Sequence, residues 1–490
     1  MPDEEKPKSE AKADDKDKKR KLLGIEPVET HHELSLMTRT LKYTARAGVI
    51  PLKDEFDETE AEVFFTAYTL EDVGDISARP LVFCFNGGPG SASIWLHLGA
   101  IGPYRVRMAD EGWMPPPPYQ IEPNEHTWLD VADLVFVDPV GTGYSRAAKE
   151  DLDKKFWNFK GDIESTGEFI RLYLTRYHRW ASPLYMAGES YGTTRVAGLA
   201  GLLVEQGIAF NGLILISTAL ALRPIFFEEG DDLPFQLFVP TYTAAAWYHK
   251  KLGPDLQQRE LRELLDEVED WSGSDYTVAL MKGDRLTDTE RQSIARTLAR
   301  YTGLEESYVL GSNLRIDIMR FCKELLRAEK RSIGRLDSRF KGIEAIGVNE
   351  VPEFDVSMVA IKPPYTAMFN SYAATELGVQ TDLTYIALNE DIEPKWEWEK
   401  GKLPNTGEAL RTAIAKNRFM RVFVGQGFYD LATPHFATEY MINHMNVDPE
   451  VRQNISMAYY PAGHMFYLDV ASLAQLKRDA AGFVESASNG

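Results

Sequence analysis

Short apolar runs, each followed by turn residues, are the feature that most constrains the fold of this chain. Six runs of this kind occur: Leu81–Phe85, Leu134–Val137, Leu184–Ala187, Leu213–Ile216, Arg421–Val424 and Ile455–Tyr460. Such runs suit strands that are buried on both faces of a parallel sheet. Helical patterns lie between them, for example over Gly161–Tyr177 and Ala197–Glu205. We therefore expect an α/β fold with a mostly parallel central sheet.

The alternation of strands and helices is interrupted once, between about Leu222 and Pro363. This stretch is helical and charged in pattern, as in LQQRELRELLDEVEDW and DTERQSIARTLARY. We interpret residues 222–363 as a helical cap inserted into the core, whose two parts are residues 25–221 and 364–490. Before the first apolar run, Glu33–Ala47 and Ala61–Leu70 carry strand patterns of alternating or β-branched residues.

Composition narrows the classes of partner. The formal net charge is -20 over 490 residues, which argues against nucleic acid and against an anionic membrane surface. No run approaches the length of a membrane span. Residues 1–24 begin with a charged, almost apolar-free segment that lacks the apolar core of a signal peptide, so we expect a disordered tail. The sequence does not indicate an oligomeric state.

Two cysteines, Cys84 and Cys322, are too few for a disulfide framework. We expect Cys84 to be a buried thiol, since it lies in the apolar run LVFCF. The expected location is cytoplasmic on the sequence as given, or periplasmic or secreted if a leader was removed.

The sharpest local motif is Gly188-Glu189-Ser190-Tyr191-Gly192. It follows the apolar run LYMA and precedes a helical pattern. Gly-x-Ser-x-Gly at a strand-to-helix turn places a serine on a tight bend at the carboxyl edge of the sheet, where α/β folds build their sites. We therefore predict that Ser190 is a nucleophile.

A serine hydroxyl needs a base, and in folds of this kind the acid and then the histidine follow the serine along the chain. Of the four later histidines, His249 falls in the predicted cap, while His435 and His444 lie in or near one helical stretch. His464 follows a late strand beside a glycine, which favours it as general base. Asp430 lies in the loop after the preceding strand and is the candidate acid, although an aspartate there also suits a helix N-terminus.

An oxyanion hole is expected from two backbone N–H groups. One is that of Tyr191, the residue after the nucleophile, and the other comes from an earlier strand-to-helix loop. Asn86-Gly87-Gly88-Pro89-Gly90 follows the strand LVFCF and has the residues for such a loop. It lacks the Lys-Ser/Thr of a phosphate-binding loop, and no metal-binding motif occurs in the sequence. We expect neither a metal nor a cofactor.

With these residues the chain resembles the serine carboxypeptidase family, the group of carboxypeptidase Y and cathepsin A. The resemblance rests on NGGPGSAS, DPVGTGYS, GESYG, GFYDLATP and AGHM, which begin at Asn86, Asp138, Gly188, Gly427 and Ala462. The phrase YDLATP and the scarcity of cysteine look more like bacterial branches. The resemblance implies an α/β-hydrolase fold with a cap, peptide substrates, and release of C-terminal residues through an acyl-enzyme.

Residue by residue, the resemblance implies a triad of Ser190, Asp430 and His464 and an oxyanion hole of the Gly88 and Tyr191 amides. It also implies that Asn86, the Gly87 amide and Glu189 bind the terminal carboxylate of the substrate. The family pairs this glutamate with a second one, whose place here falls on Ala100. Two carboxyl groups in contact raise one pKa strongly. The departure at Ala100 therefore predicts a weaker acidic preference than the family shows.

Two other functions stay open. An esterase, amidase or acyltransferase would use the same triad, and Ala100 favours this alternative. A non-catalytic binding protein on a hydrolase scaffold has no need to keep Ser190, Asp430, His464 and NGGPG together.

Overall fold

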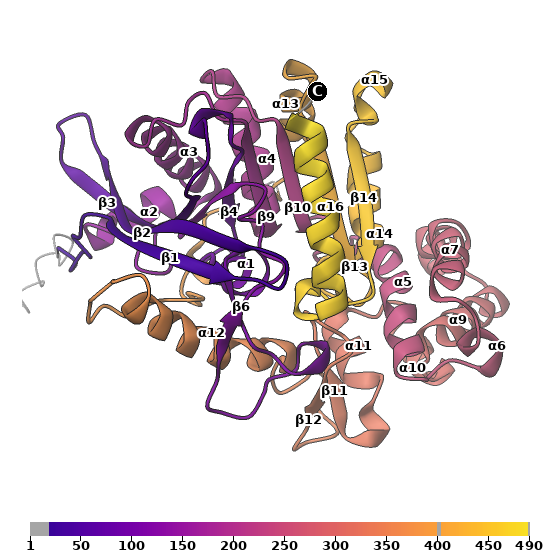
Figure 1. Cartoon of the computed structure of the whole chain (residues 1–490). Coiled ribbons are helices and arrows are strands. Elements are labelled where there is room, and N and C mark those ends of the chain that lie inside the picture. The colour runs from indigo at the N-terminus through magenta and orange to yellow at the C-terminus, as the bar shows by residue number, and fades with distance from the viewer. Residues whose placement is uncertain (1–18, 399–402, 489–490) are drawn as a thin grey trace, which may run out of the picture.

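The structure is a computed structural model that describes residues 19–398 and 403–488. Its centre is a twisted sheet in the order β1-β2-β3-β7-β4-β9-β10-β13-β14, with β8 paired to β3 (Figure 1). The strands are β1 Val28–Ser35, β2 Thr40–Lys53, β3 Thr59–Leu70, β4 Leu81–Phe85, β7 Asp133–Val137, β8 Arg146–Ala147, β9 Leu184–Ser190, β10 Gly212–Thr218, β13 Arg421–Gly427 and β14 Ile455–Tyr460. From β7 to β14 every neighbouring pair is parallel. All six apolar runs form strands, as the sequence predicts.

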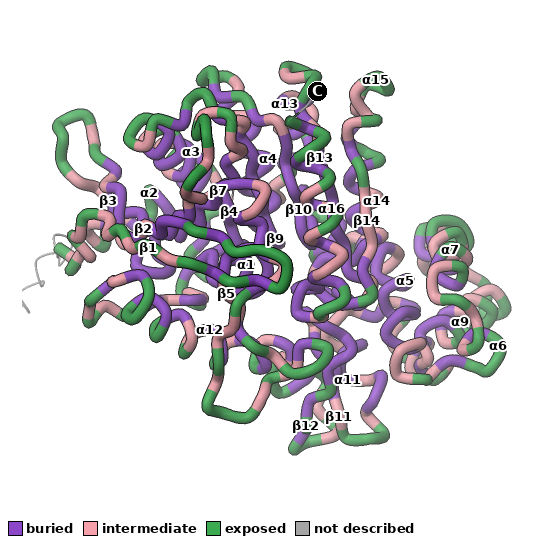
Figure 2. The backbone as a smooth tube through the Cα atoms, viewed as in Figure 1, coloured by how far each residue is buried: buried purple, intermediate pink, exposed green. Residues whose placement is uncertain are grey.

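Two apolar layers cover the sheet. Strand residues alternate between them, so that Phe83 belongs to one layer and Cys84, a buried free thiol, to the other. Figure 2 shows the central strands buried along most of their length. The helices of the core are α1 Ile94–Leu96, α2 Asp153–Phe156, α3 Phe159–Arg176, α4 Tyr191–Glu205, α13 Gly407–Lys416, α14 His435–Asn443, α15 Pro449–Arg452 and α16 Val470–Ser488. Helices α3, α4 and α13 contribute to the first layer and α16 to the second.

A mainly helical segment separates β10 from β13 and lies along one end of the sheet (Figure 1). Its helices are α5 Leu233–Tyr248, α6 Pro254–Gln257, α7 Leu261–Trp271, α8 Thr277–Lys282, α9 Asp288–Thr302, α10 Glu306–Gly311, α11 Ile318–Glu324 and α12 Val356–Thr375. It also contains a small antiparallel pair, β11 Arg331–Ile333 with β12 Lys341–Ile343, which the sequence pattern did not predict. A second such pair, β5 Tyr104–Val106 with β6 Ile121–Pro123, belongs to the core.

The other helical elements of the described residues are short 3-10 or π-helical turns. They are η1 Ile76–Ala78, η2 His97–Ile101, η3 Asp110–Gly112, η4 Glu150–Leu152, η5 Ser272–Tyr276, η6 Gly283–Arg285, η7 Arg327–Glu329, η8 Glu393–Lys395 and η9 Phe466–Leu468, of which η2 and η5 are π-helical.

Three predicted boundaries differ from the structure. The segment Glu33–Ala47 is not one strand, because a turn at residues 36–39 separates β1 from β2. The predicted end of the cap at residue 363 falls inside α12, since Pro363 and Pro364 lie within that helix. Residues 1–18 of the predicted tail lie outside the described residues, but Arg20 forms an ion pair with Asp153, so residues 19–24 lie along the core.

Candidate active site

Ser190 lies where β9 ends and α4 begins, at a sharp turn of the backbone. Its φ is 59° and its ψ is -130°, a conformation that non-glycine residues rarely adopt and that is found mainly at functional sites. A Cβ on Gly188 would lie 2.4 Å from the carbonyl oxygen of Gly192, so the flanking glycines allow the turn to close. The bend leaves Ser190 partly exposed to a cavity of about 470 Å³.

Asp430 and His464 meet at the same edge of the sheet. Asp430 follows β13, His464 follows β14, and the Asp430 Oδ2 to His464 Nδ1 distance is 2.7 Å. Both side chains are buried. Burial acts to lower the pKa of His464, but the Asp430 carboxylate outweighs it, so the pKa lies above the ordinary value. Since Nδ1 is engaged by Asp430, Nε2 is the nitrogen that remains for a substrate or nucleophile.

The Asp430 carboxylate is itself fixed by its own loop. Oδ1 accepts hydrogen bonds from the amides of Ala432 at 2.7 Å and Thr433 at 3.0 Å, and Oδ2 accepts one from the Thr433 hydroxyl at 2.6 Å. These bonds orient the carboxylate toward the imidazole.

The loop that carries His464 is held by residues from the segment between β10 and β13. The His464 amide donates to the carbonyl oxygen of Leu336 at 2.6 Å, and the Gly463 amide donates to Asp337 Oδ2 at 3.2 Å. Arg339 forms a buried ion pair with Asp337 at 2.7 Å. The sequence reasoning missed these residues, because no local pattern links them to a loop more than 120 positions away.

The loop Asn86–Gly90 lies beside Ser190 and is anchored by Arg195. The Arg195 guanidinium is 1% exposed, donates to the carbonyl oxygen of Asn86 at 2.7 Å, and pairs with Asp162 at 2.9 Å. The Tyr191 hydroxyl donates to the same Asp162 carboxylate at 3.2 Å. Gly88 and Tyr191 both line the cavity, as does Gly87. Arg195 thus links the two backbone segments that the sequence assigns to an oxyanion hole.

Glu189 is buried next to the serine and lines the cavity. Burial raises the pKa of Glu189 to about 7. The hydroxyl of Tyr467 donates to Glu189 Oε2 at 2.5 Å. Ala100 is buried in η2. The structure therefore places a tyrosine hydroxyl, and not a second carboxyl group, against Glu189.

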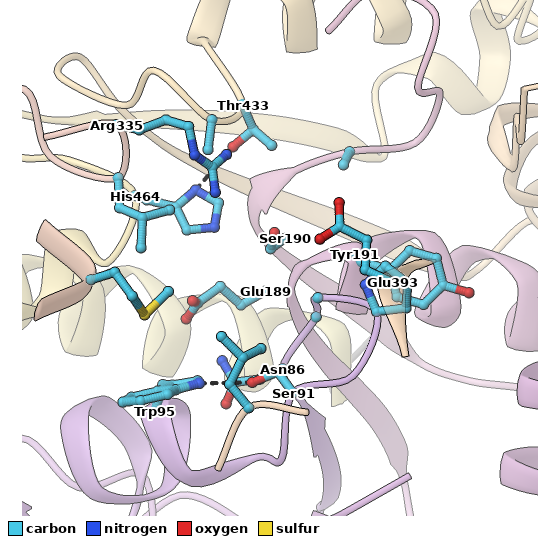
Figure 3. A pocket seen from close by; sticks show the side chains of 18 of the residues that line it. Asn86, Ser91, Trp95, Glu189, Ser190, Tyr191, Arg335, Glu393, Thr433 and His464 are labelled. Atoms are coloured by element: carbon cyan, nitrogen blue, oxygen red, sulfur yellow. Dashed lines mark hydrogen bonds between the residues drawn. The ribbon is translucent and has the colours of Figure 1, made fainter. Parts of the chain in front are cut away.

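Figure 3 shows the cavity from close by, with side chains that line it. Ser190, His464 and Glu189 lie near one another, with Arg335 beside His464 and Glu393 on another wall (Figure 3). The remaining histidine candidates are engaged elsewhere: His249 with the carbonyl oxygen of Ser338, His435 with Glu269, and His444 with the carbonyl oxygen of Tyr440.

Within residues 19–398 and 403–488, no cluster of three or more His, Cys, Asp or Glu side chains could hold a metal ion. None of the helices in these two ranges is both long enough and apolar enough to cross a membrane.

The architecture is that of an α/β-hydrolase. The solved structure of a prohormone-processing carboxypeptidase from Saccharomyces cerevisiae superposes with a TM-score of 0.57, at 17% identity and over 91% of each chain. At this identity the likeness establishes the fold, which confirms the predicted fold class.

The family predicted from the motifs is confirmed over the first part of the chain. Residues 37–221 match the model of the family described as serine carboxypeptidase. A pheromone-processing carboxypeptidase from Komagataella phaffii is 32% identical over 165 residues, which cover 32% of this chain and 23% of the relative. The corresponding protein of Saccharomyces cerevisiae is 33% identical over 171 residues, 33% of this chain and 22% of the relative. The match therefore spans less than a quarter of either relative's length. Both organisms are yeasts, and the bacterial branch stays a prediction.

Proposed function

We propose that the protein is a serine-type carboxypeptidase that releases C-terminal residues from peptides through an acyl-enzyme. The observation that carries this proposal is the cavity in which Ser190, His464 and a buried Glu189 with a raised pKa lie together. Ser190 and His464 supply the groups for acyl transfer, and Glu189, while it is protonated, supplies a neutral carboxylic acid beside them. The relatives with carboxypeptidase names support the same activity.

In the proposed reaction, His464 Nε2 takes the proton of Ser190 as the hydroxyl oxygen attacks the last peptide carbonyl. Asp430 accepts a hydrogen bond from Nδ1–H and stabilises the imidazolium that forms. The amides of Gly88 and Tyr191 would stabilise the oxyanion. His464 then gives its proton to the leaving amine. In the second half of the reaction water attacks the ester on Ser190, while His464 takes a proton from the water and returns it to the oxygen of Ser190.

Recognition of the terminal carboxylate falls to Asn86, the Gly87 amide and Glu189. The Asn86 Nδ2 atom is buried and makes no hydrogen bond of normal geometry in the part of the chain that the structure describes. The Asn86 side chain lies close enough to Glu189 to lower the pKa of that carboxyl group, so the Asn86 amide is a donor that can be offered to a ligand beside Glu189. Glu189 can donate a hydrogen bond only while it is protonated. With its pKa near 7, Glu189 keeps its proton over much of the range below neutrality.

An esterase, amidase or acyltransferase remains the second candidate, favoured by Ala100 in place of a second glutamate. Such an enzyme would gain nothing from a buried acid beside the nucleophile whose raised pKa keeps it largely protonated below pH 7. Because burying an ionisable group costs stability, its presence supports a substrate with a carboxylate.

A cytoplasmic location also stays a proposal. The two cysteines are free and buried, which fits a reducing compartment. Cell fractionation with an antibody to the full chain tests it, and recovery in a secreted or periplasmic fraction would refute it.

The test of the activity is a set of N-blocked dipeptides that differ only at the C-terminus: free acid, amide and methyl ester. The proposal predicts a much higher kcat/KM for the free acid than for the amide. Equal hydrolysis of acid and amide, or hydrolysis of the ester alone, would favour the second candidate. The Ser190→Ala variant should lose all three activities and stay folded.

A further inference from the structure

Tyr467 occupies the position against Glu189 that the family resemblance assigns to a second glutamate. It lies in η9, three residues after His464, and its hydroxyl donates to Glu189 Oε2 at 2.5 Å. Both side chains are buried. A hydrogen bond between two buried groups on different elements fixes the orientation of the carboxyl plane.

The turn η2 leaves room for this tyrosine. A Cβ on Gly99 would lie 2.7 Å from Cε2 of Tyr467 and 2.6 Å from the hydroxyl oxygen of Tyr365. Such contacts are too close for any side chain, so glycine at position 99 lets both rings approach η2. The next residue, Ala100, is small and buried. The absence of a carboxyl group at Ala100 and the contact of the Tyr467 hydroxyl with Glu189 thus belong to one local arrangement.

We propose that Tyr467 is a specificity-determining positioning residue for the C-terminal carboxylate of the substrate. Its hydroxyl holds Glu189 Oε2, which leaves Oε1 to carry the proton that is offered to the carboxylate of the leaving residue. This inference rests on the proposed carboxypeptidase function and names the device by which the same site selects free carboxylates.

A tyrosine differs from a second carboxyl group in its titration. Burial raises the pKa of Tyr467 well above its usual range, so it stays a neutral donor wherever the enzyme works. Two paired carboxyl groups titrate together in two coupled steps, whereas Tyr467 keeps its proton and adds no second step to the titration of Glu189. Binding of a terminal carboxylate should therefore depend on one proton.

The other titratable groups near Glu189 come from three elements. They are His464 after β14, Asp430 after β13, and Tyr365 on α12. The His464 imidazolium stabilises the Glu189 anion and Asp430 opposes it, so His464 is the group whose titration is coupled to that of Glu189. The methyl ester has no carboxylate for Glu189 to bind, so its KM lacks that contact, and its kcat/KM reports the titration of His464.

The experiment compares the free acid and the methyl ester of one N-blocked dipeptide across pH 5 to 9, using the full chain. For the wild type, KM for the free acid should rise with a slope of one proton above the pKa of Glu189, and KM for the ester should not. A two-proton slope, or the same rise for the ester, would overturn the inference.

The deciding variant is Tyr467→Phe, with Tyr365→Phe as the matched control. The control removes a neighbouring buried hydroxyl that makes no hydrogen bond to protein in the described ranges. In Tyr467→Phe we expect KM for the free acid at pH 6 to rise about tenfold, the loss expected for a hydrogen bond to an ionisable group, and KM for the ester at the same pH to stay the same. Since the Tyr467 hydrogen bond lowers the pKa of Glu189, the alkaline rise in KM should also move to higher pH.

The inference would be overturned if Tyr467→Phe kept the wild-type ratio of KM for the acid to KM for the ester and the wild-type pH profile. It would also be overturned if Tyr365→Phe had the larger effect on KM for the free acid. If Tyr467→Phe does not fold, Gly99→Ala displaces the same ring from the other side and should show the same selective loss. The one-proton slope of the wild type decides the matter if neither variant folds. A wild type that hydrolyses acid and amide equally refutes the proposed function itself, independently of any variant.

Discussion

The guanidinium of Arg195 donates a hydrogen bond to the carbonyl oxygen of Asn86 at 2.7 Å, from within the helix that begins next to Ser190. This contact ties the loop after β4 to the turn after β9, the two segments that supply the proposed oxyanion donors. Because Arg195 also pairs with Asp162, which in turn accepts from Tyr191, one buried network sets the relative position of both.

Replacing Arg195 by methionine should damage both stability and catalysis. The change leaves Asp162 buried without its partner, which costs about 3–5 kcal/mol, and frees the Asn86 loop. We expect kcat to fall for acid, amide and ester substrates alike, as measured by steady-state kinetics beside urea unfolding. The double variant Arg195→Met/Asp162→Asn removes both charges, so stability should return while kcat stays low. Recovery of kcat in the double variant would show that Arg195 does not act through the loop.

Replacing Asp337 by asparagine should weaken catalysis through the loop of His464. Asp337 accepts from the Gly463 amide and neutralises the buried Arg339. We expect kcat to fall about tenfold on every substrate, since misplacing a general base affects all acyl transfers. Glu329→Gln is the matched control, because Glu329 lies in the same segment between β10 and β13 and forms ion pairs with Lys251 and Lys341 at the surface. A loss confined to free-acid substrates, or the same loss in the control, would contradict this account.

The acid limb of the pH profile should report His464. The Asp430 carboxylate raises the pKa of His464 above the ordinary value of 6.5. Because His464 acts as a base only when it is neutral, kcat/KM for the ester should rise with pH through a pKa above 6.5. The Glu189 anion also acts to raise this pKa, so Glu189→Gln should move the limb to lower pH. A free acid needs neutral His464 and protonated Glu189 together, which places its optimum near neutrality. A sharp optimum below about pH 5 would contradict both assignments.

Glu189→Gln should stabilise the fold in a pH-dependent way. Burial raises the pKa of Glu189 from 4.5 to about 7, so the native state binds this proton more tightly than the unfolded state. The stability that this proton contributes is complete below pH 4.5 and is lost as the pH rises through 7. The free energy of unfolding of the variant minus that of the wild type should therefore be up to about 3 kcal/mol larger at pH 8 than at pH 4. Urea unfolding at both pH values measures this, and a constant difference would contradict the raised pKa.

The sequence anticipated those parts of the structure that depend on local pattern. The apolar runs predict β4, β7, β9, β10, β13 and β14 because strands buried on both faces need unbroken hydrophobic side chains. The positions of Ser190, Asp430 and His464 follow strand ends, so a correct sheet brings them to one edge.

What the sequence did not predict depends on contacts between distant segments. Nothing around Tyr467 indicates that its hydroxyl meets Glu189, which lies 278 positions earlier. The sequence pattern around Arg195 indicates only a helix residue, because its partners Asp162 and Asn86 come from other parts of the chain. The predicted cap ends at Pro363, yet α12 continues through Pro363 and Pro364, because packing of a helix can override local preference.

The most direct test of the account follows one peptide with a free C-terminus by mass spectrometry, beside its C-terminal amide and beside the Ser190→Ala variant. The account predicts stepwise loss of single residues from the C-terminus of the free peptide, slow or no loss from the amide, and none with Ser190→Ala. Internal fragments, equal cleavage of the amide, or undiminished release by Ser190→Ala would contradict a carboxypeptidase that works through Ser190.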